Sequence, residues 1–322
     1  MPVLGLDIGY SNVKVAVGDN EKTLKCTLFP ATAAPLAQLI EAGLGADTAI
    51  RGVPVGNLEY VVGVTPERLA HYHRALHADY TATNAYRALF YGALLAYGKR
   101  NVDVVVTGLP SGQFRDATLR KRLGTLMSGA HTLGKERTVT VNEVKVVPQP
   151  IGAYLDFVSS EDADVDDARV LVIDVGYYSV DWVLVKENRL QGEGLGSSQL
   201  ASAALLDKAV QAIAKDYGKI LPDTLEARWR QGKTQVRLYD KQVELLPYLT
   251  SAAKEVAGAV IQGILPSLRQ REEAIDVILL AGGGAGPYAQ PIKEAFPRSQ
   301  LVLRPEAVFA NARGFWRYGR GD

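Results

Sequence analysis

The chain of 322 residues is 47% hydrophobic and 22% charged, and its formal net charge is +1. These values are typical of a globular protein long enough for two domains; they exclude a disordered or fibrous chain and recruitment to nucleic acid or anionic membrane by net charge. The single cysteine, Cys26, excludes an internal disulfide and a cysteine metal cluster. Because the amino terminus has no basic region followed by a long apolar run, and no segment is long enough to span a bilayer, we expect a cytoplasmic protein.

Strands and helices are predicted to alternate through the first half of the chain. Residues 102–107 are rich in β-branched side chains, which is typical of a strand buried on both faces. Residues 81–97 carry apolar side chains at helical spacing, and Gly98 follows as a predicted cap. Predicted strands cover residues 3–8, 12–18, 23–29, 53–64, 102–107 and 139–147, and predicted helices cover residues 81–97, 114–126 and 152–158.

An acidic segment, residues 159–167, separates this half from the second, which opens with another hairpin at Arg169. Further predicted helices cover residues 200–217, 249–270 and 309–318, and further predicted strands cover a hairpin at 234–246, then 275–280 and 301–304. Because strands and helices alternate in both halves, we expect an α/β fold.

One segment of the chain occurs twice. Residues Leu6–Val17 align without a gap with residues Ile173–Leu184, so that Asp7 matches Asp174 and Gly9 matches Gly176. Each copy consists of an apolar strand, a carboxylate, a glycine-containing turn and a second strand. The repeat predicts two similar halves, each with an acidic hairpin.

The first of these turns suits a phosphate group. Its residues, Gly9, Tyr10, Ser11 and Asn12, can offer backbone N–H groups and a hydroxyl, and Lys14 adds a positive charge for the β-phosphate. A surface hairpin whose polar residues only stabilise the turn is the alternative for either copy alone. The gapless repeat favours binding.

The second turn offers the corresponding groups, with two tyrosines among them. Because the bulky Tyr177 and Tyr178 occupy it, we expect phosphate binding there to depend on Ser179 and on backbone N–H groups, including that of Gly176. Mg²⁺ is commonly bound by one or two carboxylates together with phosphates, so Asp7 and Asp174 are predicted to hold it through its waters. Asp181 either lines this site or forms a structural ion pair.

A run of three glycines, Gly282, Gly283 and Gly284, follows the predicted strand at 275–280. Glycines let the backbone approach a nucleotide closely, and the start of a helix beyond them could receive the α-phosphate or ribose. Many loops between strands and helices contain glycines, so the run alone does not indicate a nucleotide site. Its position after both hairpins is what favours one.

The order of these motifs resembles the superfamily of actin, sugar kinases and heat-shock chaperones. The two hairpins correspond to the two phosphate motifs of that superfamily, and Gly282–Gly284 corresponds to its adenosine motif. Pro148-Gln149 corresponds to its first connecting motif, and Asn311–Gly314 corresponds to its second. Within it the chain most resembles the ParM/StbA plasmid segregation proteins, on the segment Val144–Pro148, the stretch Asp79–Asn84 and the compact length.

The resemblance implies a catalytic role for Gln149, together with Asp7 and Asp174. ParM-type proteins carry Glu at this position, whereas Gln is the residue of actin. An amide cannot titrate as a base, but it can orient the attacking water, which is the main requirement of phosphoryl transfer. The alternative is a polar residue in a Pro-x-Pro turn.

The resemblance further implies a two-lobed, actin-like α/β fold with an interlobe nucleotide cleft, in which residues 1–150 and 305–322 form domain I and residues 151–304 form domain II. It implies binding of ATP, or GTP, with Mg²⁺, and hydrolysis that controls the turnover of head-to-tail filaments in plasmid segregation. The implied partners are further copies of the chain and a centromere-binding adaptor protein; direct DNA binding and membrane binding are not expected, because the net charge is nearly zero.

Two other functions stay open at this stage. A small-molecule kinase of the same superfamily would need an acid beside an acceptor hydroxyl, and the loop Gly108–Gly112 offers Ser111 without one. A filament scaffold with little ATP turnover is the other alternative.

Overall fold

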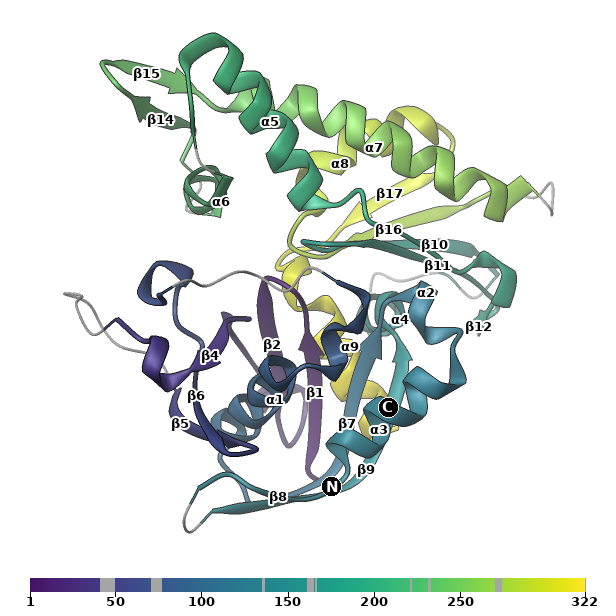
Figure 1. Ribbon diagram of the computed structural model, residues 1–322. Helices are drawn as coiled ribbons and strands as arrows, with labels where there is room; N and C mark the ends of the chain where they lie inside the picture. Colours follow the sequence, from purple (N-terminus) through teal and green to yellow (C-terminus); the bar gives the residue numbers. More distant parts are fainter. Residues whose placement is uncertain are drawn as a thin grey trace. The chain divides into compact units, whose positions relative to one another are not determined.

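The computed structural model describes residues 1–40, 50–70, 77–134, 137–160, 165, 167–220, 222–230, 233–269 and 274–321. The chain forms two compact units, residues 1–164 with 306–322 and residues 165–305 (Figure 1). Each has its own β-sheet and helices, so the expected α/β fold is confirmed. The expected boundary at residue 150 falls within helix α4, Gln149–Val158, which packs along α9, Ala310–Arg320, in the first unit.

The first unit is built on a six-stranded sheet of order β3-β2-β1-β7-β9-β8. Strands β1 to β3 form an antiparallel meander, and β7 and β9 run parallel to β1. The strands are β1 (Val3–Ile8), β2 (Asn12–Val17), β3 (Lys25–Pro30), β7 (Asn101–Leu109), β8 (Gly129–Thr132) and β9 (Thr138–Pro148).

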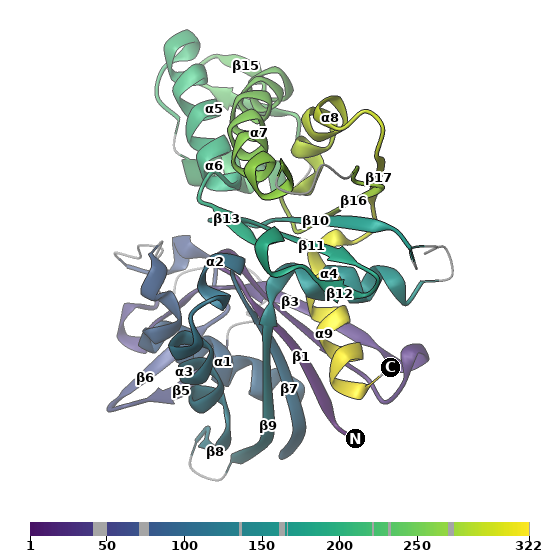
Figure 2. The ribbon, with the colours of Figure 1, turned by 90° about the vertical axis from the view of Figure 1, so that its right-hand side faces the viewer.

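Helices cover both faces of this sheet, as Figure 2 shows from the side. Leu4 and Leu6 of β1 face α1 (Asn84–Tyr97) and α3 (Ala117–Met127), whereas Val3 faces α9 on the opposite side. The alternation follows from the two-residue period of a strand. The remaining elements of this unit are the short helix α2 (Ser111–Phe114) and a separate sheet of order β4-β6-β5, with strands Ala33–Pro35, Leu58–Val62 and Ile50–Val55.

The second unit is built on a sheet of similar strand order. Its sheet has the order β12-β11-β10-β16-β17, with β13 paired to β11, and helices α5, α7 and α8 pack against one face. The strands are β10 (Arg169–Val175), β11 (Val180–Lys186), β12 (Arg189–Leu190), β13 (Gly196–Ser198), β16 (Val277–Ala281) and β17 (Gln300–Leu303), and the helices are α5 (Ser202–Tyr217), α7 (Leu246–Arg269) and α8 (Ala285–Ala295). Helix α6 (Pro222–Arg230) and the hairpin β14 (Gln235–Leu238) and β15 (Lys241–Glu244) lie between α5 and α7 in the chain.

Helix α4 starts earlier than the sequence predicted, and helix α6 was absent from the prediction. Helix α4 begins at Gln149, three residues earlier than expected, because Pro150 is acceptable in the first turn, where a helix needs no N–H donor. Helix α6 was not predicted, because its short sequence is mostly polar and its apolar spacing is weak.

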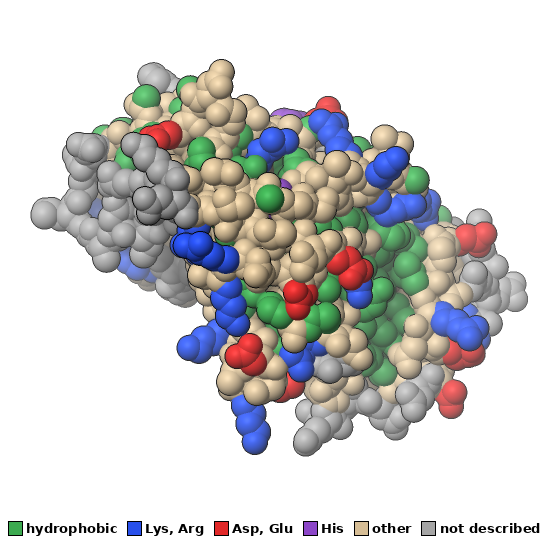
Figure 3. Space-filling view, turned by 90° about the horizontal axis from the view of Figure 1, so that it is seen from below, with side chains coloured by type: hydrophobic (Ala, Val, Ile, Leu, Met, Phe, Trp, Pro, Cys, Tyr) green, Lys and Arg blue, Asp and Glu red, His purple; other side chains and the backbone are tan. Residues whose placement is uncertain are grey.

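The surface carries no dominant sign of charge on the face seen in Figure 3, where acidic and basic side chains lie interspersed. Of the helices in the described part of the chain, none combines the length and the apolar character that a membrane span requires.

Candidate functional site

The two repeated hairpins form the same turn. The N–H of Gly9 donates to the carbonyl of Asn12 at 3.1 Å, and the N–H of Gly176 donates to the carbonyl of Ser179 at 2.9 Å. Each turn follows a buried carboxylate near the end of a strand, Asp7 with 4% and Asp174 with 8% of its surface exposed. The duplicated motif therefore folds into duplicated geometry.

In the first unit, Asp7 contacts two of the other predicted site residues. Lys14, its cross-strand partner, places Nζ 3.0 Å from Asp7 Oδ2. Gln149 donates from Nε2 to Asp7 Oδ1 at 3.2 Å. Both carboxylate oxygens are thus engaged, and the amide of Gln149 is oriented with its nitrogen toward Asp7, since a carboxylate can only accept.

Gln149 lies at the first position of α4, directly after its N-cap residue Pro148. A glycine permits this placement: a Cβ atom on Gly108 of β7 would lie 2.7 Å from Cγ of Gln149. The end of β7 and the start of α4 can therefore pack closely enough for Gln149 to reach Asp7.

The side chain of Tyr10 packs against other residues of the first unit and does not extend freely into solvent. Its ring stacks on Tyr80 with 4.6 Å between centroids, and its hydroxyl donates to the carbonyl of His77 at 2.9 Å. In the same turn, Asn12 Nδ2 donates to Ser11 Oγ at 3.2 Å. The stack fixes the turn from one side, so the contribution expected from Tyr10 falls to its backbone.

In the second unit, Asp174 stands opposite Asp181 in the register of β10 and β11. Directly opposite residues of an antiparallel pair have Cβ atoms about 4.5–5.5 Å apart. Ser179 donates its hydroxyl to Asp181 Oδ2 at 2.6 Å, so this side chain, predicted to bind phosphate, is directed to a carboxylate instead. The position that holds Lys14 in the first unit thus holds a second, buried acid here.

The glycine run packs against Asp174 and Val175. Gly282 has φ of +86°, and a Cβ atom on it would lie 2.4 Å from Asp174 Oδ1. The N–H of Gly284 donates to the carbonyl of Val175 at 3.0 Å, while Gly283 is exposed. The structure therefore brings Asp174 and Gly282–Gly284 together within one unit.

The start of α5 supports the second turn, a role that the sequence did not reveal. Ser202 donates its hydroxyl to the carbonyl of Gly176 at 2.8 Å, and the N–H of Ala203 donates to the carbonyl of Tyr177 at 2.9 Å. The ring of Tyr177 packs against the core of the unit, and Tyr178 is half-buried. A serine at the start of a helix is too common to have indicated this contact.

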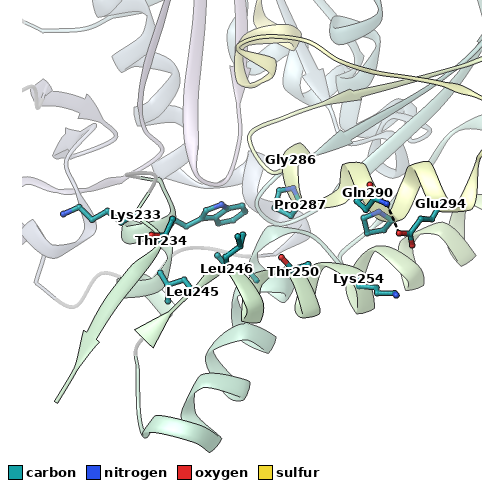
Figure 4. Close-up of a pocket in the computed structure, with 13 residues that line it drawn as sticks. Lys233, Thr234, Leu245, Leu246, Thr250, Lys254, Gly286, Pro287, Gln290 and Glu294 are labelled. Carbon is teal, nitrogen blue, oxygen red and sulfur yellow. Dashed lines mark hydrogen bonds between the residues drawn. The ribbon is translucent and has the colours of Figure 1, made fainter. Parts of the chain in front are cut away.

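A pocket of about 580 Å³ opens beside the glycine run (Figure 4). Its walls come from α6, the start of α7 and the first turns of α8, where Gly286 and Pro287 follow the glycines. Apolar walls are provided by Trp229, Leu245, Leu246, Leu249, Pro287 and Pro291, and polar groups by Lys233, Thr234, Thr250, Lys254, Gln290 and Glu294. Apolar walls with a few polar groups are typical of small-molecule sites.

Comparisons with known proteins agree with this architecture. Residues 5–152 match the family "Actin like proteins N terminal domain", and residues 172–294 match "Archaeal actin homologue MreB-like, C-terminal". The chain is therefore similar to actin-like proteins in both of its units. A protein of Thermoplasma volcanium named "Archaeal actin homolog" is 25% identical to this chain over an alignment of 330 positions, which covers 98% of each of the two chains.

Solved structures show the same fold. The crystal structure of an archaeal actin homolog in complex with ADP has a TM-score of 0.79 at 22% identity, over 100% of this chain and 99% of that chain. A 15-stranded ParM filament from Clostridium botulinum has a TM-score of 0.72 at 18% identity, over 100% and 99% of the two chains. The actin-like fold is thus confirmed, whereas the narrower ParM/StbA assignment stays a prediction.

Proposed function

We propose that this protein binds ATP or GTP with Mg²⁺, hydrolyses it and assembles into filaments whose turnover depends on that hydrolysis. The contacts of Gln149 with Asp7 are the main support. They hold a side chain that can orient water beside a turn whose backbone suits a phosphate group.

Gln149 would act through its carbonyl oxygen. Because Asp7 accepts from Nε2, the carbonyl oxygen on the other branch of the amide is left to accept a hydrogen bond from the attacking water and so to orient it. Lys14 balances the charge of Asp7, so that the turn presents no net negative charge to a phosphate. Positioning of this kind supplies most of the catalysis in phosphoryl transfer.

The second unit would bind the nucleoside and the rest of the phosphate chain. The pocket beside the glycine run has the size and the apolar walls that a base and ribose require. Gly283, the exposed residue of the glycine run, has no side chain, so its backbone would approach the α-phosphate closely.

Mg²⁺ fits the acidic pair of the second unit better than it fits Asp7. Asp174 and Asp181 are two buried carboxylates with no lysine at the position equivalent to Lys14, whereas Asp7 already faces an ammonium group. In the part of the chain that the structure describes, no three His, Cys, Asp or Glu side chains converge as a metal site. That suits Mg²⁺, which retains waters and phosphate ligands and would supply neutralisation of phosphate charge.

Filament formation rests on the likeness to filament-forming relatives, among them the ParM filament of Clostridium botulinum. A head-to-tail contact repeated along an axis gives an open polymer. Plasmid segregation, with a centromere-binding adaptor as partner, is the specific role that we infer from the ParM-like motifs.

Light scattering and phosphate release test the proposal together. After addition of ATP and Mg²⁺, scattering should rise above a critical protein concentration and later decay as phosphate appears, and electron microscopy should show filaments only with nucleotide. Scattering that stays flat at high concentration, while a small acceptor molecule accelerates ADP release, would identify a kinase instead. Scattering that never decays, without phosphate release, would identify a scaffold.

A further inference from the structure

A network of buried ions joins α4 to α9 and to the segment after β2. Arg313 of α9 donates from Nε and Nη2 to the two oxygens of Asp156 of α4, at 2.8 and 2.7 Å. Arg317, one turn further along α9, also donates to Asp156, and it donates to both oxygens of Glu21 at 2.8 and 3.0 Å. Asp156 is only 3% exposed, so its charge depends on these two arginines.

The hydrogen bonds of this network fix the orientation of the two helices as well as their distance. A guanidinium that pairs with a carboxylate through two parallel hydrogen bonds fixes both the distance and the plane of its partner. Arg313 and Arg317 have 14% and 13% of their side chains exposed, whereas Glu306, at 3.8 Å from Arg313, has 72% exposed and lies at the rim. The inner pairs therefore hold α4 at a defined rotation relative to α9.

The two helices pack along each other, and their backbones come into contact at a pair of glycines. A Cβ atom on Gly314 of α9 would lie 1.8 Å from the carbonyl oxygen of Gly152 of α4, so only glycine permits the contact. Next to this contact, the N–H of Ala153 donates to Asn311 Oδ1 at 3.2 Å. Any tilt of α4 relative to α9 would have this contact as its fulcrum, because the two backbones cannot approach further here.

Helix α9 is itself held against the hairpin that carries Asp7. A Cβ atom on Gly5 of β1 would lie 2.2 Å from the carbonyl of Ala312, and Trp316 donates its indole N–H to the carbonyl of Gly18 at 3.2 Å. Because α9 lies against β1 and β2, any tilt of α4 relative to α9 is also a tilt relative to Asp7.

Gln149 and Asp156 lie on opposite sides of the fulcrum. At a rise of about 1.5 Å per residue, Gln149 is about 4.5 Å before Gly152 and Asp156 about 6 Å after it. A displacement of about 1 Å at Asp156 would therefore swing Gln149 by about 0.75 Å. We propose that Asp156 is a positioning residue for Gln149, one that sets the placement of its amide against Asp7 through Arg313 and Arg317. This inference rests on the catalytic role proposed for Gln149.

The variant Asp156→Asn tests it. An asparagine keeps the shape of the side chain, but its NH₂ group faces a guanidinium, so one side of the network is lost. The expected result is a fall in kcat for ATP of about 10- to 100-fold, since a misplacement of about 1 Å can cost that much, with KM within about twofold of wild type. Glu306→Gln, at the exposed rim of the same network, is the matched control and should change neither value.

A second measurement separates this inference from the proposed function. The side-chain amide signal of Gln149 in a ¹H–¹⁵N spectrum, identified by its absence in Gln149→Ala, should shift in Asp156→Asn without nucleotide and stay in place in Glu306→Gln. If wild type does not hydrolyse nucleotide, the proposed function fails while this readout still tests the positioning. Should Asp156→Asn not fold, Arg317→Gln, which leaves Arg313 in place, is expected to give the same shift. An unmoved amide signal or an unchanged kcat in a folded variant would overturn the proposal.

Discussion

Replacing Lys14 with methionine should destabilise the first unit by several kcal/mol. The ammonium lies 3.0 Å from Asp7 Oδ2, and the two side chains are 15% and 4% exposed, so little water screens the pair. At that distance of 3.0 Å, Coulomb attraction amounts to about 5.5 kcal/mol with an effective dielectric constant of about 20. Because desolvation offsets part of it, we expect a loss of about 3–5 kcal/mol when one partner of such a buried pair is removed.

Urea unfolding of a double-mutant cycle measures this quantity. The cycle comprises wild type, Lys14→Met, Asp7→Asn and the double variant, and we expect a coupling free energy of about 2–3 kcal/mol, the upper range for contacting residues. Lys99 and Asp19 form the control pair: their side chains are 57% and 80% exposed at 3.5 Å, so about 0–1 kcal/mol is expected. Equal coupling in the two cycles would refute the inference that Lys14 neutralises a buried Asp7.

Three other predictions concern the site and the core. Gln149→Ala should slow phosphate release about 100-fold with nearly unchanged nucleotide affinity, and an unchanged rate would place catalysis elsewhere. Asp174→Ala should abolish Mg²⁺-dependent turnover; normal turnover at ordinary Mg²⁺ concentrations would contradict its role as a ligand. Burial, then the charge of Arg87, lowers the pKa of His131, while its hydrogen bond to Met127 raises it. Since the net shift places the folded pKa below the unfolded value of about 6.5, the unfolded state binds the proton more readily and stability is lost as pH falls below about 6.5. Urea midpoints at pH 7.5 and 5.5 should differ less in His131→Phe than in wild type, and an equal difference would show that His131 is not responsible.

The pocket gives a further prediction that needs no activity. Trp229 lines it and is half-buried, whereas Trp182 and Trp316 are 4% and 0% exposed. Nucleotide should therefore change the intrinsic fluorescence mainly through Trp229, and the change should be absent in Trp229→Phe. A full response in that variant would place the base outside this pocket.

The sequence predicted the two halves because the pattern that identifies each hairpin lies within about twelve neighbouring residues and occurs twice. Spacing alone identified β1, β2, β10 and β11, and the gapless match of their turns indicated that Asp7 and Asp174 are equivalent. The long buried strand β7 was evident from its β-branched residues. Periodicity and turn chemistry act within a few residues, so they can be read without the fold.

What the sequence did not predict depends on contacts between distant segments. The hydrogen bond from Gln149 to Asp7 joins residues 142 positions apart, and Arg313 reaches Asp156 over 157 positions. Ser179 was expected to bind a phosphate, and in the structure its hydroxyl donates to Asp181. The pairing register of β10 and β11 places Asp181 at this end of the hairpin. The pocket, too, arises only when α6, α7 and α8 pack together.

The place of α9 in the first unit has a consequence for biosynthesis. This helix follows the whole second unit in the chain, yet it packs against Gly5 and Gly152 and contributes Phe315 and Trp316 to the core on one face of the first sheet. On the ribosome, residues 165–305 can emerge and fold while the first unit still lacks one of its covering layers. A nascent chain arrested at residue 305 would leave the apolar side chains that α9 covers, among them Val3, Val104 and Val106, open to chaperones.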